Sequence, residues 1–259
     1  MPPPDRRLIT AEDLFRYRLV SDPQVSPDGE RVVYVLQRTD REENKYFSNL
    51  WLVRADGSGN RAFTSGNHSD RNPRWAPDGS ALAFVSDRDE KSQIWRIPAD
   101  GGEAEALTRL EEGLIGALAW APDGSRIVFT YRPKPPWARK NEKEEREKAH
   151  RSTPPVHIRR LAYREEGAGY FGDERWHLFV VDVASHSVTQ LTHGETDETS
   201  PAWSPDGARI AFITNRSDDP DRTPQLDEIR IIPAEGGEEE QVAAPAGPKQ
   251  VLSWSPDGD

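Results

Sequence analysis

The four-residue stretch Ser26-Pro27-Asp28-Gly29 returns four more times along the chain and decides the fold class. Pro presets φ near −65° at the second turn position, Asp bonds its own backbone, and Gly takes the positive φ that closes a reversal between two strands. The other copies are Ala76-Pro77-Asp78-Gly79, Ala121-Pro122-Asp123-Gly124, Ser204-Pro205-Asp206-Gly207 and Ser255-Pro256-Asp257-Gly258. The successive turn prolines are 50, 45, 83 and 51 residues apart. Periods of about 40–50 residues are typical of propellers or solenoids.

The residues around each turn keep the same register. Four positions before the turn Gly stand Val25, Trp75, Trp120, Trp203 and Trp254. Apolar runs that are rich in β-branched and aromatic residues follow each complete turn at 32–35, 82–85, 127–130 and 210–213, as in strands buried on both faces. Each unit then supplies a third strand, at 50–53, 94–97, 178–181 and 229–232, and a short final strand. Four short strands per unit predict a propeller blade rather than a solenoid coil.

The predicted fold is therefore all-β: an incomplete β-propeller of four four-stranded blades plus the start of a fifth, with a short N-terminal helix. Residues 1–20 form the N-terminal segment, in which Thr10 to Leu19 is an amphipathic helix with Thr10 as N-cap and Asp13 at N3. Residues 21–259 form the partial propeller. Its blades are predicted at about 21–66, 67–110, 114–194 and 196–244, with the next blade starting at 249–259.

The third unit is longer because it contains an insertion at 133–175. Between Arg132 and Arg164 there are eleven Lys or Arg and four Glu, a local charge of +7. The stretch is either a solvated excursion, with a short helix over 142–150, or a gate or docking arm. Its second half, 157–164 followed by 167–170, is better patterned and predicts an extra strand or hairpin.

Composition limits the partners. The net charge is −11 over 259 residues, which argues against general nucleic-acid binding and favours solubility. No stretch approaches the roughly 18–20 apolar residues that cross a membrane, and the N-terminus lacks the apolar core of a secretory signal. Cysteine is absent, which excludes disulfides. We expect a cytoplasmic protein with no membrane or nucleic-acid partner.

The sequence yields no catalytic, cofactor-binding or metal-binding residue. The Gly-x-Ser-x-Gly elbow of α/β-hydrolases is missing, and Gly57-Ser58-Gly59 has the wrong spacing. No phosphate-binding glycine loop supports a nucleotide cofactor. The six His are scattered without ligand spacing and are interpreted as solvated or loop residues. The run from Asp218 to Asp221 resembles a calcium loop without its Gly and Glu, and is interpreted as a solvated blade loop.

Repeated side chains have simpler interpretations. The Trp and Phe at fixed register are expected to form the core between blades. An Arg recurs nine positions after the turn Gly as Arg38, Arg88 and Arg216, with Arg132 one place early in the third unit. These Arg side chains either pair with Asp of neighbouring blades or ring one mouth of the channel, and the first is favoured.

The sequence also resembles a known family. Thr10-Ala11-Glu12-Asp13-Leu14-Phe15, the run from Val20 to Gly29, the run from Ile158 to Arg164 and the run from Trp203 to Gly207 resemble prolyl oligopeptidase family serine peptidases. The similarity is greatest to the acylaminoacyl-peptidase and dipeptidyl-peptidase-like branch and covers essentially all 259 residues. The turn repeat by itself is shared with TolB-like propellers.

The resemblance implies a propeller that precedes an α/β-hydrolase domain, caps its active site and restricts access to short peptides. The family's catalytic residues have no matching positions here, and we expect the chain alone to be inactive. Four blades where the family has seven or eight indicate a truncated protein or fragment whose missing partner is the C-terminal hydrolase domain. The alternative is a TolB-like propeller that serves as a protein-interaction module. Open blade edges also predict self-association.

Overall fold

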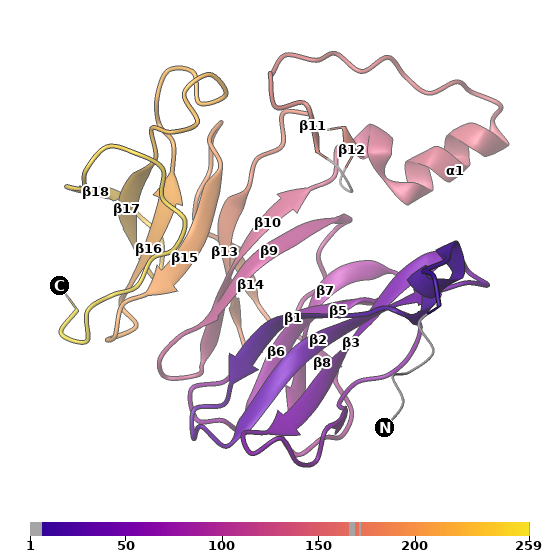
Figure 1. The fold of residues 1–259 in the computed structure, drawn as a ribbon. Coiled ribbons are helices and arrows are strands. Elements are labelled where there is room, and N and C mark those ends of the chain that lie inside the picture. Colours follow the sequence, from indigo (N-terminus) through magenta and orange to yellow (C-terminus); the bar gives the residue numbers. More distant parts are fainter. Residues whose placement is uncertain (1–6, 166–168, 171, 259) are drawn as a thin grey trace. The chain divides into compact units, whose positions relative to one another are not determined.

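Four four-stranded antiparallel sheets make up the core of the fold (Figure 1). The structure, a computed structural model, describes residues 7–165, 169–170 and 172–258. In each sheet the strands follow one another as neighbours, as predicted for propeller blades. Parts of the N-terminal segment (1–6), of the insertion (166–168 and 171) and of the fifth-blade start (259) lie outside the described residues.

The strands occupy the predicted registers. The first sheet contains β1 (Arg18–Val25), β2 (Arg31–Asp40), β3 (Lys45–Arg54) and β4 (Arg61–Ala62). The second contains β5 (Asp70–Trp75), β6 (Ala81–Asp89), β7 (Lys91–Pro98) and β8 (Glu105–Ala106). The third contains β9 (Gly113–Trp120), β10 (Arg126–Pro133), β13 (His177–Asp182) and β14 (Val188–Gln190). The fourth contains β15 (Glu198–Trp203), β16 (Arg209–Thr214), β17 (Glu228–Pro233) and β18 (Glu240–Val242).

The insertion between β10 and β13 contains a short 3-10 turn, η2 (Pro136–Ala138), and the helix α1 (Lys140–Lys148), close to the helix predicted at 142–150. It also contains the small hairpin of β11 (Arg164–Glu165) and β12 (Gly169–Tyr170), in the region where the sequence predicted one. No helix among the described residues is long and apolar enough to cross a membrane.

The N-terminal helix is shorter than predicted. The structure has a 3-10 helix, η1 (Ala11–Arg16), where the sequence predicted a short amphipathic helix from Thr10 to Leu19. The predicted start is right, because the backbone N–H of Thr10 donates to the Asp13 carboxylate at 2.9 Å. The predicted end is wrong, because Arg18 and Leu19 pair with β2 as the first residues of β1. Sheet pairing, which the local pattern does not reveal, ends the helix.

The repeated turn has the expected geometry. In the first copy Gly29 has φ of 75° and its N–H donates to the Ser26 carbonyl at 2.8 Å. The Ser26 hydroxyl, and then the Glu30 N–H, hold the pKa of Asp28 below its usual value. Asp206 has the same two kinds of donor, and backbone N–H groups are the largest cause of the lowered pKa at Asp78 and Asp123. The turn carboxylates are therefore bonded most strongly when ionised.

We expect acid to weaken the fold through these turns. A carboxylate whose pKa is lowered by folding contributes stability above the ordinary aspartate value of 3.8, and that contribution is lost as the pH falls through the lower folded-state pKa. The temperature of the thermal unfolding midpoint should therefore decrease as the pH is lowered from about 4 through the lower folded-state pKa values. The variant in which Asp28, Asp78, Asp123 and Asp206 are each replaced by Asn should show a smaller decrease of the thermal midpoint over the same pH range. Equal slopes for the two proteins would contradict the prediction.

Neighbouring sheets within a unit are joined by a repeated contact, here called the joint, that consists of a Trp, its hydrogen bond and an Arg over its ring. The sequence register predicted the position of the Trp but not the hydrogen bond or the Arg. Three of the Trp residues that stand four positions before a turn Gly donate their indole N–H to a carbonyl of the first strand of the preceding sheet. These bonds run from Trp75 to Gln24 at 3.1 Å, from Trp203 to Ala119 at 3.0 Å and from Trp254 to Ala202 at 3.0 Å. An Arg of the preceding sheet covers each ring at 5.0–5.1 Å, namely Arg31, Arg126 and Arg209. Trp254 makes the same joint on the fourth sheet, as the predicted start of a fifth blade requires.

The chain forms two compact units, and the core of each is made by residues at equivalent positions of the repeat. The first unit extends to Glu90 and includes Trp95–Ala104; the second comprises Lys91–Ile94 and the chain from Glu105. In the first unit the core comprises Val33, Val35, Leu50, Leu52, Trp75, Leu82, Phe84, Ile97 and Ala99. In the second unit the core comprises Ala121, Val128, Leu178, Val180, Leu191, Trp203, Ile210, Phe212, Ile232 and Ala234. The predicted interblade role of these aromatic residues is confirmed within each unit.

A bulge recurs between the first two strands of each sheet, and the sequence analysis missed it. The register shifts between Ser21 and Gln24, and again in the other three sheets. In three of them a non-glycine residue before a Pro takes a positive φ: Asp22 at 46°, Asn72 at 52° and Ser200 at 51°. The bulge accommodates the Pro, which cannot donate to a sheet ladder.

Candidate functional site

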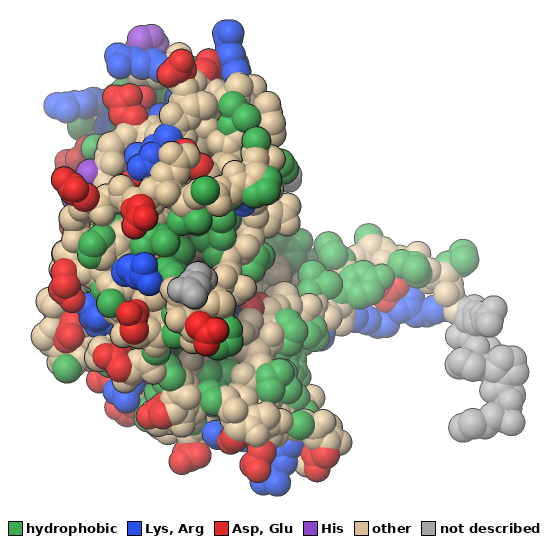
Figure 2. Space-filling model, turned by 90° about the vertical axis from the view of Figure 1, so that its left-hand side faces the viewer, with side chains coloured by type: hydrophobic (Ala, Val, Ile, Leu, Met, Phe, Trp, Pro, Cys, Tyr) green, Lys and Arg blue, Asp and Glu red, His purple; other side chains and the backbone are tan. Residues whose placement is uncertain are grey.

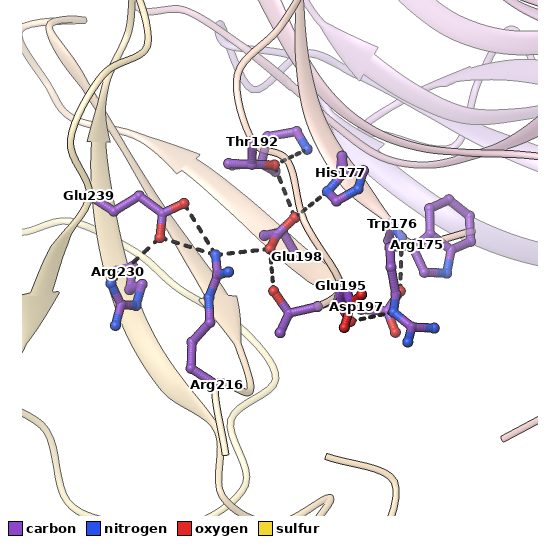
Figure 3. A network of polar contacts seen from close by, with 12 residues as sticks. Arg175, Trp176, His177, Thr192, Glu195, Asp197, Glu198, Arg216, Arg230 and Glu239 are labelled. Atoms are coloured by element: carbon purple, nitrogen blue, oxygen red, sulfur yellow. Dashed lines mark hydrogen bonds and ion pairs between the residues drawn. The ribbon is translucent and has the colours of Figure 1, made fainter. Parts of the chain in front are cut away.

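A buried carboxylate lies at the start of β15. Glu198 has no exposed surface. Its Oε2 accepts a hydrogen bond from the Thr192 hydroxyl at 2.9 Å and lies 2.7 Å from Nδ1 of His177. Its Oε1 accepts bonds from the Thr196 hydroxyl and from Nη2 of Arg216, both at 3.0 Å (Figure 3). Burial of an unpaired carboxylate is strongly unfavourable. The hydrogen bonds and the ion pair with these partners compensate for the burial of the Glu198 carboxylate.

The network continues across the fourth sheet. Nη2 of Arg216 also lies 3.0 Å from the Glu239 carboxylate, and the Arg230 guanidinium lies 3.6 Å from the same group (Figure 3). Thr192 follows β14 of the third sheet, whereas Glu198 belongs to the fourth. The network therefore ties the two sheets of the second unit together at their rim.

The arrangement does not form an activated nucleophile. A catalytic triad needs a hydroxyl bonded to the imidazole whose other nitrogen faces the acid. The Thr192 hydroxyl instead donates to the carboxylate itself and accepts the Leu178 N–H at 2.9 Å. In the described part of the chain, the Glu198 network is therefore suited to positioning segments rather than to acyl transfer.

The first unit repeats the arrangement around Asp70 in β5, which is also fully buried. The Thr64 hydroxyl, six residues earlier, donates to Asp70, as Thr192 does to Glu198. Arg88, eighteen residues later, bonds Asp70 at 2.9 Å, as Arg216 bonds Glu198. This Thr–acid–Arg spacing is visible in the sequence once the contacts are known, and it was missed.

The third copy departs from the pattern. Six positions after Thr108 stands Leu114, and the Thr108 hydroxyl donates instead to Gln93 at 2.8 Å. Gln93 also accepts the Leu110 N–H at 2.8 Å. An amide of the same sheet thus replaces the buried acid at this position.

The root of the insertion is fixed to the fourth sheet. Nη2 of Arg160 lies 3.1 Å from Asp221 and 3.4 Å from Asp197, and the Ala162 N–H donates to Asp221 at 3.2 Å. The Trp176 N–H donates to Asp197 at 2.8 Å. Burial is the largest single influence on Asp221 and raises the pKa of this carboxyl, but the Arg160 bond and charge together with backbone N–H donors lower it overall.

Two interpretations of this region need correction. Asp218 and Asp219 are exposed, as expected of a solvated loop, but Asp221 is mostly buried because it anchors the insertion. His177 lies within β13 beside Glu198 and is not a solvated or loop residue, because its strand pairs with β10. The described residues include no group of three His, Asp or Glu placed to hold a metal ion. The expectation of no catalytic, cofactor or metal residue stays a prediction.

The recurrent Arg side chains make contacts within the chain, but not with Asp residues of neighbouring blades, which was the favoured interpretation. Arg88 and Arg216 bond acids of their own sheets rather than Asp of a neighbouring blade. Arg38 bonds Asn67 at 2.7 Å, and Arg132 lies buried with its guanidinium 4.7 Å from the Trp176 ring. The acid of the same sheet is reached because the second strand runs back to the level where the first begins.

Charge is mixed on the surface as well. On the face shown in Figure 2, Asp and Glu side chains are scattered among Lys and Arg side chains. The net charge of −11 is therefore not gathered into one patch on that face. The stretch from Arg132 to Arg164, with its local charge of +7, departs from the acidic balance of the chain.

Comparison with known proteins identifies similar sequences and folds. The model of the TolB beta propeller domain matches residues 14–149. The uncharacterized peptidase YuxL of Bacillus subtilis is 35% identical over 218 residues, which are 83% of this chain and 32% of YuxL. Dipeptidyl-peptidase 5 of Porphyromonas endodontalis is 28% identical over 226 residues, which are 81% of this chain and 31% of that protein.

A solved structure supports the fold. The acylaminoacyl peptidase of Pyrococcus horikoshii superposes with a TM-score of 0.67 at 19% identity, over 89% of this chain and 33% of that one. At this identity the likeness concerns the fold alone. The chain spans about a third of the length of each of these three proteins.

Proposed function

The chain belongs to the TolB β-propeller domain family, and from this premise we propose that it is the non-catalytic propeller part of a serine peptidase. The observation that carries the proposal is the coverage. A chain that is 83% matched accounts for only 32% of the peptidase YuxL, so most of that peptidase has no counterpart here. The missing partner would be a C-terminal α/β-hydrolase domain that carries the Ser-Asp-His triad.

In this proposal the propeller caps the active site and restricts access to short peptides. Two features of the chain support such a role. The joint between the sheets of the second unit combines the buried Trp203, its hydrogen bond to Ala119 and Arg126 over the ring, which favours a fixed arrangement of these sheets. The insertion is anchored at its root by Arg160 and Asp221, so it can present a defined surface to a substrate or a partner domain.

We expect the 259-residue chain alone to be inactive on peptide p-nitroanilides, because a nucleophile, its base and an oxyanion hole are all needed. The reading frame that encodes the chain tests whether the chain is part of a longer peptidase. A continuation beyond Asp259 that encodes Gly-x-Ser-x-Gly should give an enzyme that cleaves peptides of a few residues and spares chains of about thirty.

Deletion of the propeller from that enzyme is the control, and it should abolish the preference for short peptides. Hydrolysis by the 259-residue chain, abolished by a serine-reactive phosphonate, would overturn the proposal. Equal cleavage of short and long peptides by the longer enzyme would remove the capping role and leave the peptidase assignment intact.

The second candidate is a TolB-like module that binds another protein. The observation that favours it is the family model itself, which matches more than half of the chain. A reading frame that ends without a hydrolase domain, together with retention of a specific partner on the immobilised chain, would favour this candidate over the peptidase.

A further inference from the structure

A cavity of about 250 Å³ lies beneath the insertion. Figure 1 shows α1 and the β11–β12 hairpin near the end of β10, and all three contribute to its walls or border them. At about 30 Å³ for each water molecule of liquid, the cavity has room for about eight. It therefore suits one amino-acid-sized group rather than an extended peptide.

The walls are held in place by their own hydrogen bonds. Glu112 accepts the ammonium of Lys134 and, at 2.7 Å, the backbone N–H of Lys140 at the start of α1. Arg146 of the same helix donates to the carbonyl of Trp137. The helix and the segment before it are thus fixed to each other and to the rim of the third sheet. A cavity braced in this way keeps its shape without a ligand.

The cavity is positively charged in an acidic protein. Arg132, Lys134 and Lys143 line it, and among the residues that the structure describes Glu174 is the one acid in the lining. Lys134 is already paired with Glu112. Lys143 is exposed, and no hydrogen bond or ion pair joins its ammonium to a described residue, although its charge acts on Glu112 through space. The ammonium is therefore available to a ligand. One available cation favours a monoanion over a phosphate dianion, which needs several donors.

The rest of the lining is apolar or aromatic. Leu114, Pro135, Trp137 and Tyr170 contribute to it. We propose that this cavity binds a small monocarboxylate with an apolar or aromatic body, held by Lys143 and flanked by Trp137 and Tyr170. Such a group occurs at the free C-terminal residue of a short peptide and in N-acylated amino acids. The inference goes beyond the proposed function and requires no hydrolysis.

Calorimetric titration of the 259-residue chain tests the proposal. N-acetyl-L-phenylalanine should bind about tenfold or more tightly than its uncharged amide, because a charge-assisted bond is lost in the amide. Lys143→Gln should weaken binding of the acid by a similar factor. Lys148→Gln, at the end of the same helix and outside the lining, is the matched control and should change nothing. Glu174→Gln should tighten binding several-fold, since it removes the negative charge from the lining.

Two further measurements complete the test. One distinguishes a peptide C-terminus from an N-acylated amino acid as the ligand, and the other shows whether a loss of binding comes from misfolding. A tripeptide ending in a free phenylalanine supports the proposal if it binds, and tighter binding than the acetylated amino acid identifies the peptide end as the source. Lys143→Arg keeps the charge and should retain binding even if Lys143→Gln melts early. Equal binding of acid and amide, equal affinities of K143Q and K148Q, or tighter binding of phenyl phosphate would each overturn the proposal.

Discussion

Trp203→Ala is expected to destabilise the second unit by about 3–5 kcal/mol, the usual cost of removing a buried Trp. The side chain is 8% exposed and lies among Val128, Ile210 and Phe212 in the core between the third and fourth sheets. Its loss also leaves the Ala119 carbonyl without its indole donor and Arg126 without its ring. Hydrogen exchange should report the loss as faster exchange in β9 and β15.

Trp254 provides a matched control within the same chain. It makes an equivalent hydrogen bond, to Ala202, and lies beneath an equivalent Arg. However, it is only partly buried, since no further sheet covers it among the described residues. Trp254→Ala should therefore cost less than half as much as Trp203→Ala. Equal costs would mean that the polar contacts, rather than burial, determine the strength of the joint.

Glu198→Ala is the second large effect and should also cost about 3–5 kcal/mol, because it breaks a buried ion pair and leaves buried hydroxyl groups without their acceptor. Arg216 keeps Glu239 as a partner, which places the expected cost at the lower end of that range. The hydroxyls of Thr192 and Thr196 lose their acceptor. Chemical denaturation of the variant, followed by circular dichroism, measures the loss.

Two further variants test whether the loss of stability comes from the buried ion pair of Glu198. Glu195→Ala removes a nearby exposed carboxylate and should change stability by less than about 0.5 kcal/mol. Adding Arg216→Met to Glu198→Ala should recover part of the loss, because removal of both partners is less costly than removal of one. If the double variant were less stable than Glu198→Ala, the pairing of Arg216 with Glu239 would outweigh the relief from removing its unpaired charge.

Much of the fold could be predicted because it repeats. A local pattern such as Ser-Pro-Asp-Gly is weak evidence by itself, but five copies with aromatic residues at a fixed distance specify strands, turns and core together. The predicted burial on both faces holds for β6, in which the six residues from Ala81 to Ser86 are all buried.

The polar contacts could not be predicted in the same way. Glu198 and His177 are 21 residues apart in sequence, and the insertion root joins Arg160 to an Asp 61 residues away. Such pairs depend on which loops meet at the rim of a sheet, and a charged residue in a loop has the same local pattern whether or not it is buried. His177 and Asp221 were misjudged for this reason.

The sequence by itself determined the class of fold, the strand registers and the position of the joint residues, because hydrogen-bonded strands and tight turns impose short-range rules on residue type. Only the tertiary structure decided that β1 begins before the predicted helix ends, that each sheet has a bulge at its first strand, and that buried acids at Asp70 and Glu198 link neighbouring sheets. The physical reason is that burial of a charge is set by all the segments around it, and these segments are distant in the chain.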